Sequence, residues 1–497
     1  MSPATITQKL WGYAKILLAD GMSYGDYVEQ LTYLLFLKIA AERARPPYNL
    51  ESPIPKKYNW ESLLKKQGLE LSAHYDDALR VMSGKSGVLG LIFGGAQNRF
   101  KTPARLQSII VDLIDKEKWS TMSADVIGAA YEGMLEKNAQ DVKSGAGQYF
   151  TPRPLINAIV ETMAPSTGKT VCDPACGTGG FLLAAHDYVI DKNRVMEARQ
   201  KRALKENTFF GCELVNNTAR LCAMNLLLHG IGGKNEPPVT VGDSLLSPSA
   251  KKYDIVLTNP PFLSRTDGRV ARDDFWAATG KQQLNFVQHV YSMLKIDGRA
   301  AMVLPDNVLF EGGAGETVRR HLSQQCDVHT LLRLPTGVFF AQGVKANVLF
   351  FDKKPAAKNP WTKKLWIYDL RTGKNFTLKN NPLGKKDLAD FIHCYNPKNR
   401  HRRRATYDVD KNPQGRWRAY SLDELQAREK GNWDIFWLRD KSQAELENLP
   451  PPEVLIDEII KELSAAMDGL KKAKSELRSA GNLSSKKRRV KSQGGRR

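Results

Sequence analysis

The chain has 497 residues, and its 74 Lys and Arg outnumber its 53 Asp and Glu, for a formal net charge of +21. This length is enough for two to four domains with a sizeable core, and the positive charge favours a nucleic-acid backbone over a small metabolite as the binding partner. A hydrophobic content of 42% excludes wholesale disorder, and six cysteines without a CxxC pair exclude a disulfide framework, so we expect a reduced, cytoplasmic, metal-free protein.

Residues 1–142 are predicted to form a helical N-terminal domain. The most apolar stretch, 31–41, contains Lys38 and is far shorter than the roughly 20 residues that span a bilayer, so we expect a buried amphipathic helix and no membrane segment. Two further stretches have apolar residues at helical spacing: Leu10, Trp11, Ala14, Leu17 and Leu18, and then Leu106, Ile109, Ile110, Leu113 and Ile114 after Pro103.

Short apolar runs alternate with helical segments from residue 155 to about 352. This pattern predicts βαβ units and a mostly parallel sheet. The last two runs, HTLLRLP (329–335) and ANVLFF (346–351), leave no room for a helix between them, so we expect an antiparallel pair. The predicted fold class is therefore α/β.

The region from about 353 to 440 is polar, with scattered aromatics and a basic run at 398–404. We interpret this run as a solvated loop rather than a specific DNA contact. A final helix is predicted at 450–480, where Ile456, Ile460, Leu463, Met467 and Leu470 recur at alternating spacings of four and three. Such a heptad stripe packs either on a partner helix or on the chain's own domain. The basic segment 481–497 is predicted to be a disordered tail.

The segment VCDPACGTGGF (171–181) reads as a strand, a glycine-rich turn and a helix. Glycines allow close approach of backbone to a ligand, and the helix N-terminus offers free N–H donors. The turn lacks the GxGxxG order of a dinucleotide site, and Asp173 precedes the glycines. A carboxylate there repels a pyrophosphate but suits a cationic aminoacyl group.

Two acidic residues end the following strands. Glu213 stands where a carboxylate can accept hydrogen bonds from a ribose diol, and Asp243 follows the next run, where it could meet an adenine ring. Taken singly, each is more often a cap or a solvated loop acid, but their order behind the glycine turn favours a ligand role.

The segment YDIVLTNPPF (253–262) carries the predicted chemistry. A fourth strand delivers Asn259, Pro260, Pro261 and Phe262 to the carboxyl edge of the sheet. The Asn259 amide oxygen and the Pro260 carbonyl can together accept both hydrogens of a planar exocyclic amine, because prolines remove competing donors. Phe262 offers a face on which the target ring can stack.

DPACGTGG and NPPF together resemble the class I S-adenosylmethionine-dependent methyltransferases that modify adenine in DNA. With GQYFTPRPL (147–155) upstream, LPTGVFF and GVKANVLFF (334–351) downstream and the helical N-terminus, the chain is similar to the modification subunit of type I restriction–modification systems. The resemblance implies a Rossmann-like class I methyltransferase domain, here residues 143–440. The alternatives are an amino methyltransferase that acts on RNA or on a protein glutamine, because NPPF-like motifs also occur there, and a non-catalytic DNA-binding subunit.

The resemblance also implies roles for individual residues. Asn259, Pro260, Pro261 and Phe262 would be the catalytic tetrad, acting on an adenine flipped out of the duplex. Glu213 would hold the ribose, although it lies 40 positions after Asp173, about double the spacing of a compact nucleotide-binding unit. The segment that would close over the methionine end of S-adenosylmethionine comprises Gln148, Tyr149, Phe150, Thr151, Pro152 and Arg153, and the cofactor turn comprises Gly177, Thr178, Gly179 and Gly180.

The family's partners follow in the same way. The resemblance implies double-stranded DNA as substrate and a separate specificity subunit that reads the bases, with two copies of this chain for each specificity subunit. A restriction or translocase subunit can join such a complex. The helix at 450–480 is the expected contact with the specificity subunit.

Overall fold

The computed structural model describes residues 3–121, 151–232, 237–262, 270, 272–339, 345–377 and 381–438. The chain divides into two units, Met1–Leu438 and Arg439–Arg497, and the second unit lies wholly outside the described residues. The predicted helix at 450–480 and tail at 481–497 therefore lie outside them, as do Gln148, Tyr149 and Phe150.

The described N-terminal region is helical, as predicted. Its helix α2 (Tyr24–Arg43) is largely buried, and the Lys38 Nζ near the end of this helix lies 2.7 Å from an Asp115 carboxylate oxygen, which pairs the one charge in the apolar stretch. Among the described residues, no helix combines the length and the apolar character needed to cross a bilayer. The helices are α1 (Pro3–Ala19), α2 (Tyr24–Arg43), α3 (Trp60–Leu64), α4 (Gly68–Ser83), α5 (Gly87–Phe93) and α6 (Pro103–Ser108), which continues as a π-helical turn at Ile109–Ile114.

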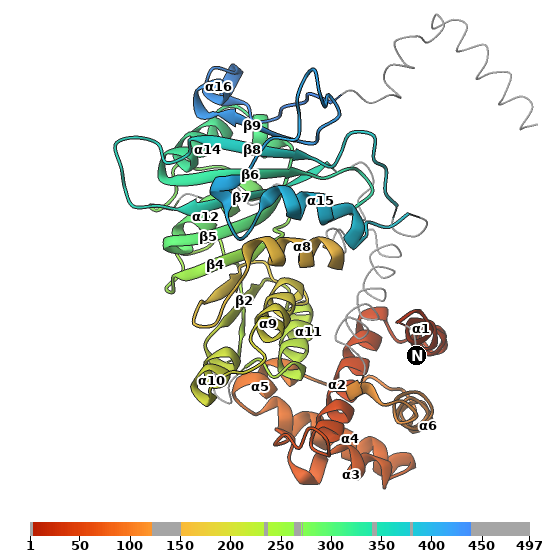
Figure 1. The fold of residues 1–497 in the computed structure, drawn as a ribbon. Helices are drawn as coiled ribbons and strands as arrows, with labels where there is room; N and C mark the ends of the chain where they lie inside the picture. The colour runs from red at the N-terminus through yellow and green to blue at the C-terminus, as the bar shows by residue number, and fades with distance from the viewer. Residues whose placement is uncertain are drawn as a thin grey trace, which may run out of the picture. The chain divides into compact units, whose positions relative to one another are not determined.

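A nine-stranded sheet in the order β3-β2-β1-β4-β5-β7-β6-β8-β9 forms the centre of the rest of the unit (Figure 1). The strands β3, β2, β1, β4 and β5 are parallel, and β7 runs antiparallel to both β5 and β6. The predicted parallel sheet with an antiparallel pair is thus confirmed. The strands are β1 (Val171–Asp173), β2 (Phe209–Glu213), β3 (Val239–Val241), β4 (Tyr253–Thr258), β5 (Leu294–Pro305), β6 (Cys326–Arg333), β7 (Ala346–Lys353), β8 (Lys364–Asp369) and β9 (Trp417–Ser421).

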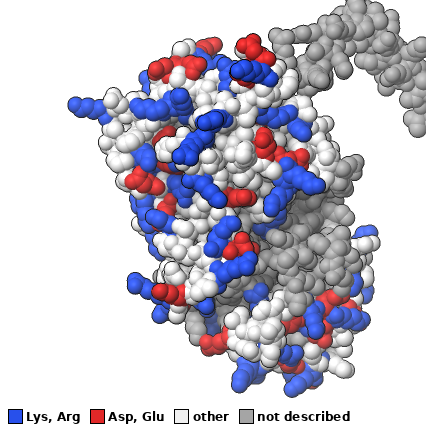
Figure 2. All heavy atoms as spheres, in the orientation of Figure 1, with Lys and Arg blue, Asp and Glu red and all other residues white. Residues whose placement is uncertain are grey.

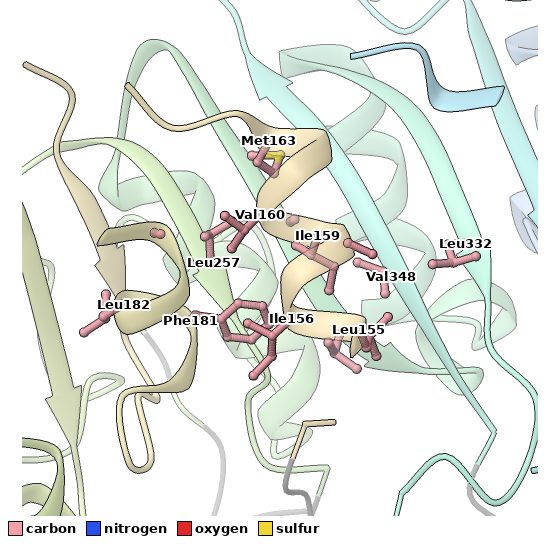
Figure 3. Packing of buried hydrophobic residues seen from close by; sticks show 14 of the residues in the cluster. Leu155, Ile156, Ile159, Val160, Met163, Phe181, Leu182, Leu257, Leu332 and Val348 are labelled. Carbon is pink, nitrogen blue, oxygen red and sulfur yellow. The ribbon is translucent and has the colours of Figure 1, made fainter. Parts of the chain in front are cut away.

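Helices cover both faces of this sheet, as the alternation of side chains along β4 requires. Leu257 belongs to the core beneath one set of helices and Val256 to the core beneath the other. Figure 3 shows α8 lying across the first face, with Ile156 and Ile159 among Phe181, Leu257 and Val348. The first face carries α8 (Arg153–Met163), α9 (Gly180–Lys192), α10 (Ala198–Glu206), α11 (Asn216–Leu228) and α15 (Lys385–Tyr395); the second carries α12 (Gln282–Met293), α14 (Ala314–Gln325) and the short helices α13 (Asn307–Phe310) and α16 (Leu422–Gln426).

The helix α11 serves two cores. Its residues Leu221, Ala223 and Met224 are buried in the hydrophobic cluster of the N-terminal helices. At the same contact, an Arg220 Nη1 donates to a Glu29 carboxylate oxygen at 2.6 Å. The N-terminal helices are therefore bonded to the helix that directly follows the strand end bearing Glu213.

The polar region after residue 353 is more ordered than predicted. It adds β8 and β9 to the sheet, and two arginines of its basic run point inward rather than into solvent. Arg400 pairs with Asp352, and the buried Arg403 donates to the Thr330 hydroxyl at 3.0 Å. On the face shown in Figure 2, Lys and Arg side chains are interspersed with Asp and Glu rather than gathered in one band.

Candidate active site

The carboxyl ends of the parallel strands bring together residues that are far apart in the sequence. Asp173 ends β1, Glu213 ends β2, Asp243 lies two residues after β3, and Asn259 follows β4. The four strands are neighbours in the sheet, and the crevice at such an edge is where open α/β sheets bind ligands.

The glycine-rich turn after β1 packs tightly against α11 at Gly179 and has free space at Gly177 among the described residues. Gly179 has φ +88°, and a Cβ there would lie 2.9 Å from the Cys222 Sγ, so only glycine fits. Gly177 has φ +52°, but a Cβ there would meet no atom of the described residues within 4 Å. An amide hydrogen bond of 3.1 Å from the Asn225 Nδ2 to the Thr178 carbonyl holds the turn on α11. Gly180 then begins α9.

Asp173 is 2% exposed at the floor of the site. Burial raises the pKa of Asp173 to about 7, although the Thr258 side chain and the Ala175 backbone N–H, 3.0 Å from its Oδ1, favour the charged form. The nearby charge of Glu213 raises it further. A cation bound next to this carboxyl group would therefore lower its pKa and favour its ionised form.

Glu213 and Asp243 both accept hydrogen bonds from backbone N–H groups. Glu213 accepts the Gly177 N–H at 3.0 Å and the Val215 N–H at 2.9 Å, which orients its carboxylate across the gap between β1 and β2. A carboxylate has about four lone-pair positions, so these two bonds leave acceptor capacity for hydroxyl groups. Asp243 accepts the Leu245 N–H at 2.9 Å.

The long interval between Asp173 and Glu213 has a simple origin. Where a compact unit has one helix between these strands, this chain has two, α9 and α10. The extra helix lies before β2, and β2 still pairs in parallel with β1, matching Asp173 with Gly211. The unusual spacing therefore does not displace Glu213 from the edge.

Asn259 is held at the end of β4 by a side chain from another part of the chain. Its Nδ2 donates to the Thr151 hydroxyl oxygen at 2.8 Å. Pro260 is buried behind it, and Phe262 is half-buried. The ring of Phe262 meets the ring of Phe339 edge to face, with centroids 6.4 Å apart and an interplanar angle of 69°.

Phe339 was not among the predicted site residues, although it lies within the LPTGVFF segment. The loop that carries it leaves β6 and is fixed at two points. The Arg371 Nε donates to the Leu334 carbonyl at 2.9 Å, and Gly337, with φ +80°, packs so closely that a Cβ would lie 1.8 Å from the Phe376 carbonyl oxygen. Phe339 therefore contacts Phe262 from a loop that is held at Leu334 and at Gly337.

Thr151 and the first residue of α8, Arg153, contact two different parts of the site. Thr151 contacts Asn259, and the Arg153 Nη1 donates to the Gly180 carbonyl at 3.3 Å, where the cofactor turn enters α9. Pro152 lies between them as the residue before α8. These three are the described members of the predicted closing segment.

The sequence matches the N-6 DNA Methylase family over residues 122–427 and the HsdM N-terminal domain over residues 6–116. It is 36% identical to the type I restriction enzyme StySJI methylase subunit of Salmonella typhimurium, and the alignment covers 96% of each chain. The type I restriction enzyme EcoKI methylase subunit of Escherichia coli is also 36% identical, again over 96% of each chain.

Solved structures give the same picture. The EcoKI M protein crystal structure has 32% sequence identity and a TM-score of 0.54, covering 94% of this chain and 95% of that chain. A type I restriction-modification methyltransferase subunit from Streptococcus thermophilus, 20% identical, shares the fold with a TM-score of 0.62 over 80% of this chain and 94% of that chain. The predicted fold class is confirmed.

Proposed function

Because this chain belongs to the N-6 DNA methylase family, as a methylase subunit of the type I restriction–modification kind, we propose that it transfers a methyl group from S-adenosylmethionine to the exocyclic amine of a flipped adenine. The observation that carries the proposal is the position of Asn259, held by Thr151 at the edge where Asp173 and Glu213 end the neighbouring strands. We propose residues 1–142 as the N-terminal domain and 143–440 as the methyltransferase domain.

The residues at this edge fit S-adenosylmethionine. The buried Asp173 suits the cationic aminoacyl end, because an adjacent ammonium offsets the cost of burying its charge. Glu213 has acceptor capacity for the ribose hydroxyls, Asp243 lies at the end of the next strand for the adenine, and the open space above Gly177 allows close approach of a ligand to backbone. When bound, S-adenosylmethionine supplies an electrophilic methyl group.

The chain's own part in the reaction is to select and orient the amine. Asn259 and the Pro260 carbonyl would accept both amine hydrogens and direct the nitrogen lone pair at the methyl group, while Phe262 stacks on the ring. Extrusion of the base costs a few kcal/mol, which these contacts would offset. No covalent intermediate with the protein is required.

Partners complete the proposal. We propose that a separate specificity subunit selects the DNA site, that two copies of this chain flank it through the helix at 450–480, and that a restriction or translocase subunit can join them. The relatives are methylase subunits of type I restriction enzymes, which supports a multisubunit assembly. We also propose that the protein acts in the cytoplasm.

Methyl transfer from radiolabelled S-adenosylmethionine tests the proposal. With the specificity subunit present, label is expected in DNA and, after hydrolysis, in N6-methyladenine. Label in RNA or in protein glutamine would support the rival enzymes. No transfer to any of the three, together with DNA binding, would support a non-catalytic subunit.

Cofactor affinity is expected to depend on pH through Asp173. Its pKa of about 7 means that the carboxylate form, which attracts the ammonium group, is lost as the pH falls through 7. If only that form binds, the dissociation constant rises about tenfold from pH 8 to pH 6. In the chain without cofactor, the free energy of unfolding depends on pH in the opposite sense. The raised carboxyl pKa stabilises the fold at low pH, and this contribution is lost as the pH rises from 3.8 to about 7.

Calorimetric titration of cofactor between pH 6 and 8 measures this dependence. The variant Asp173→Asn should bind more weakly at pH 8 and show a flat profile. An identical pH dependence in this variant would assign the titration to another group.

Gly177 offers a test of the cofactor turn. At φ +52°, Asn and Asp are both tolerated better than other residues, and within the part of the chain that the structure describes no atom lies within 4 Å of a Cβ at this position. Gly177→Asn should weaken cofactor binding about tenfold by occupying the open space, and Gly177→Asp about tenfold more, because its charge adds to that of Glu213 and repels the cofactor's carboxylate. A side chain at this positive φ is strained, so both variants should lose a little stability, and their melting temperatures should match each other. Unchanged affinity in both would remove Gly177 from the site.

A further inference from the structure

The glycine-rich cofactor turn is held by a side chain from α11, a helix that follows β2 in the sequence. The Asn225 Nδ2 donates to the Thr178 carbonyl oxygen at 3.1 Å, and the two residues are 47 positions apart. A backbone carbonyl can only accept a hydrogen bond, so this contact requires the nitrogen end of the Asn225 side chain to face the turn. Asn225 is 5% exposed, which leaves water little access to replace this donor.

The peptide group between Thr178 and Gly179 is bonded at both ends. Its carbonyl oxygen accepts from Asn225, and its N–H group donates to the Cys176 carbonyl at 2.8 Å. Together the two bonds fix the plane of this peptide and direct its carbonyl oxygen toward α11. A carbonyl oxygen turned toward the ligand would place partial negative charge near the carboxylate of the cofactor, so the orientation of this peptide bears on cofactor affinity.

The face of α11 that carries Asn225 also packs directly against the turn. Cys222 and Leu226 share this face, because residues three and four positions apart are neighbours on a helix surface. A Cβ on Gly179 would lie 2.9 Å from the Cys222 Sγ and 3.6 Å from the Leu226 Cδ2. The donor of Asn225 therefore cannot move away from the turn unless this packing opens.

Other residues of α11 are anchored in the N-terminal helices. Leu221 and Met224 are buried in the core of those helices, and the Arg220 Nη1 donates to a Glu29 carboxylate oxygen at 2.6 Å. Figure 1 shows α11 beside α9, the helix into which the turn leads. The helix is thus fixed between two cores, so its donor is in place before a cofactor arrives.

We propose that Asn225 is a positioning residue for the cofactor, which acts through the Thr178 carbonyl and holds the turn in the orientation that binds S-adenosylmethionine. This inference rests on the proposed function. Without the donor, the turn would occupy other orientations, and the apparent dissociation constant would rise as the fraction of chains in the binding orientation falls. Bound cofactor would select the binding orientation again, so the rate of transfer at saturating cofactor would change little.

The test compares Asn225→Leu with Asn193→Leu in the full-length chain. Leucine has the branched shape of asparagine but no donor, and Asn193 makes the same kind of bond, from its Nδ2 to the Val189 carbonyl at 2.8 Å, at the opposite end of α9 from the turn. In calorimetric titrations, the dissociation constant of S-adenosylmethionine should rise about tenfold in Asn225→Leu and less than about twofold in Asn193→Leu. Both variants should lose some stability, so a change in melting temperature alone would not separate them.

Two further measurements separate the donor from the shape of the side chain and binding from chemistry. Asn225→Gln keeps an amide donor on a side chain one methylene longer, so its dissociation constant should lie between those of wild type and Asn225→Leu. With the specificity subunit and saturating DNA and cofactor, single-turnover methylation by Asn225→Leu should stay within about threefold of wild type, as expected when only cofactor binding is weakened.

The outcomes distinguish the inference from the proposed function. If Asn225→Leu binds the cofactor as tightly as Asn193→Leu does, Asn225 has no positioning role, and the inference is wrong while the proposed function stands. Equal losses of affinity in Asn225→Gln and Asn225→Leu would assign the effect to the fit of the side chain rather than to its donor, which would also overturn the inference. If the wild-type chain does not bind S-adenosylmethionine, the proposed function fails and the inference fails with it.

Discussion

Replacing Asn259 by alanine is expected to lower the methylation rate by on the order of 10³-fold while the cofactor dissociation constant stays within about twofold. The side chain follows β4 and is bonded to Thr151, whereas the contacts of the cofactor turn are made by Glu213 and Asn225. Removing one preorganised polar contact to a reacting group has effects approaching this size. Single-turnover transfer to DNA and calorimetric titration of cofactor measure the two quantities separately.

The control is Asn399→Ala, which removes the same group at an exposed position in the loop after α15 and should leave both quantities unchanged. Wild-type turnover by Asn259→Ala would refute the catalytic assignment. A parallel loss of cofactor affinity would instead place Asn259 in the cofactor site.

Phe262→Ala belongs with this prediction, because the two side chains are proposed to bind the same base. Stacking on an aromatic side chain contributes roughly 1–3 kcal/mol per base, so a severe loss of methylation is expected with cofactor binding retained. Phe262→Tyr keeps the ring and should keep most activity. Phe262→Leu, which is similar in volume, should not, because a leucine side chain has no aromatic face on which the base can stack.

The arrangement of the sheet could be predicted because its strands have strong local signals. Runs such as YDIVLT are apolar, buried on both faces of the sheet and bounded by Gly, Pro or Asp. Because parallel strands end at the same edge of the sheet, the residue that follows each run could be predicted to lie at that edge. The strands β8 and β9 were not predicted, because KLWIYD and WRAYS are short and lie within polar sequence. They are recruited by pairing with β6 and with each other rather than by their own apolar length.

In the candidate site, too, some residues could be predicted from the sequence and others could not. The positions of Asp173, Glu213 and Asn259 at one edge follow from strand order, so the sequence was sufficient to predict them. The contacts of Thr151 and Phe339 depend on how α8 and the loop after β6 pack over the sheet, which no local pattern encodes. The two inward arginines of the basic run show the same limit, because Arg400 is 48 residues from its partner Asp352 and Arg403 is 73 residues from its partner Thr330.

Removing residues 453–497 is expected to leave a folded, cofactor-binding chain that no longer assembles with a specificity subunit. The described unit has its own anchors near its end: an Arg319 Nη2 donates to the Lys430 carbonyl at 2.6 Å, and Arg333, fully buried, pairs with Asp434 at 2.6 Å. These bonds keep the last described segment on the sheet without the deleted residues. The melting temperature and cofactor affinity should therefore stay close to wild type.

Assembly should fail because the deletion removes the apolar seam, which is the heptad stripe of the predicted helix at 450–480. Burying one large apolar side chain contributes about 1.5–3 kcal/mol, so loss of the five seam residues from Ile456 to Leu470 should weaken binding to the specificity subunit by at least about 10³-fold. Sequence-specific methylation should be lost with it, because the bases are proposed to be read by the partner. Copurification and methylation of DNA containing the recognition site measure both effects.

Two point variants test whether the seam itself makes the contact. Ile460→Asp places a charge in its middle, whereas Leu477→Asp lies beyond Lys474, a seam position that is already charged. A buried unpaired charge is costly and an exposed one is not, so Ile460→Asp should weaken assembly far more than Leu477→Asp. If the truncated chain copurifies with the specificity subunit at full stoichiometry, the helix packs on its own domain instead. In that case Ile460→Asp should lower the melting temperature of the isolated chain, which a seam that binds only the partner would leave unchanged.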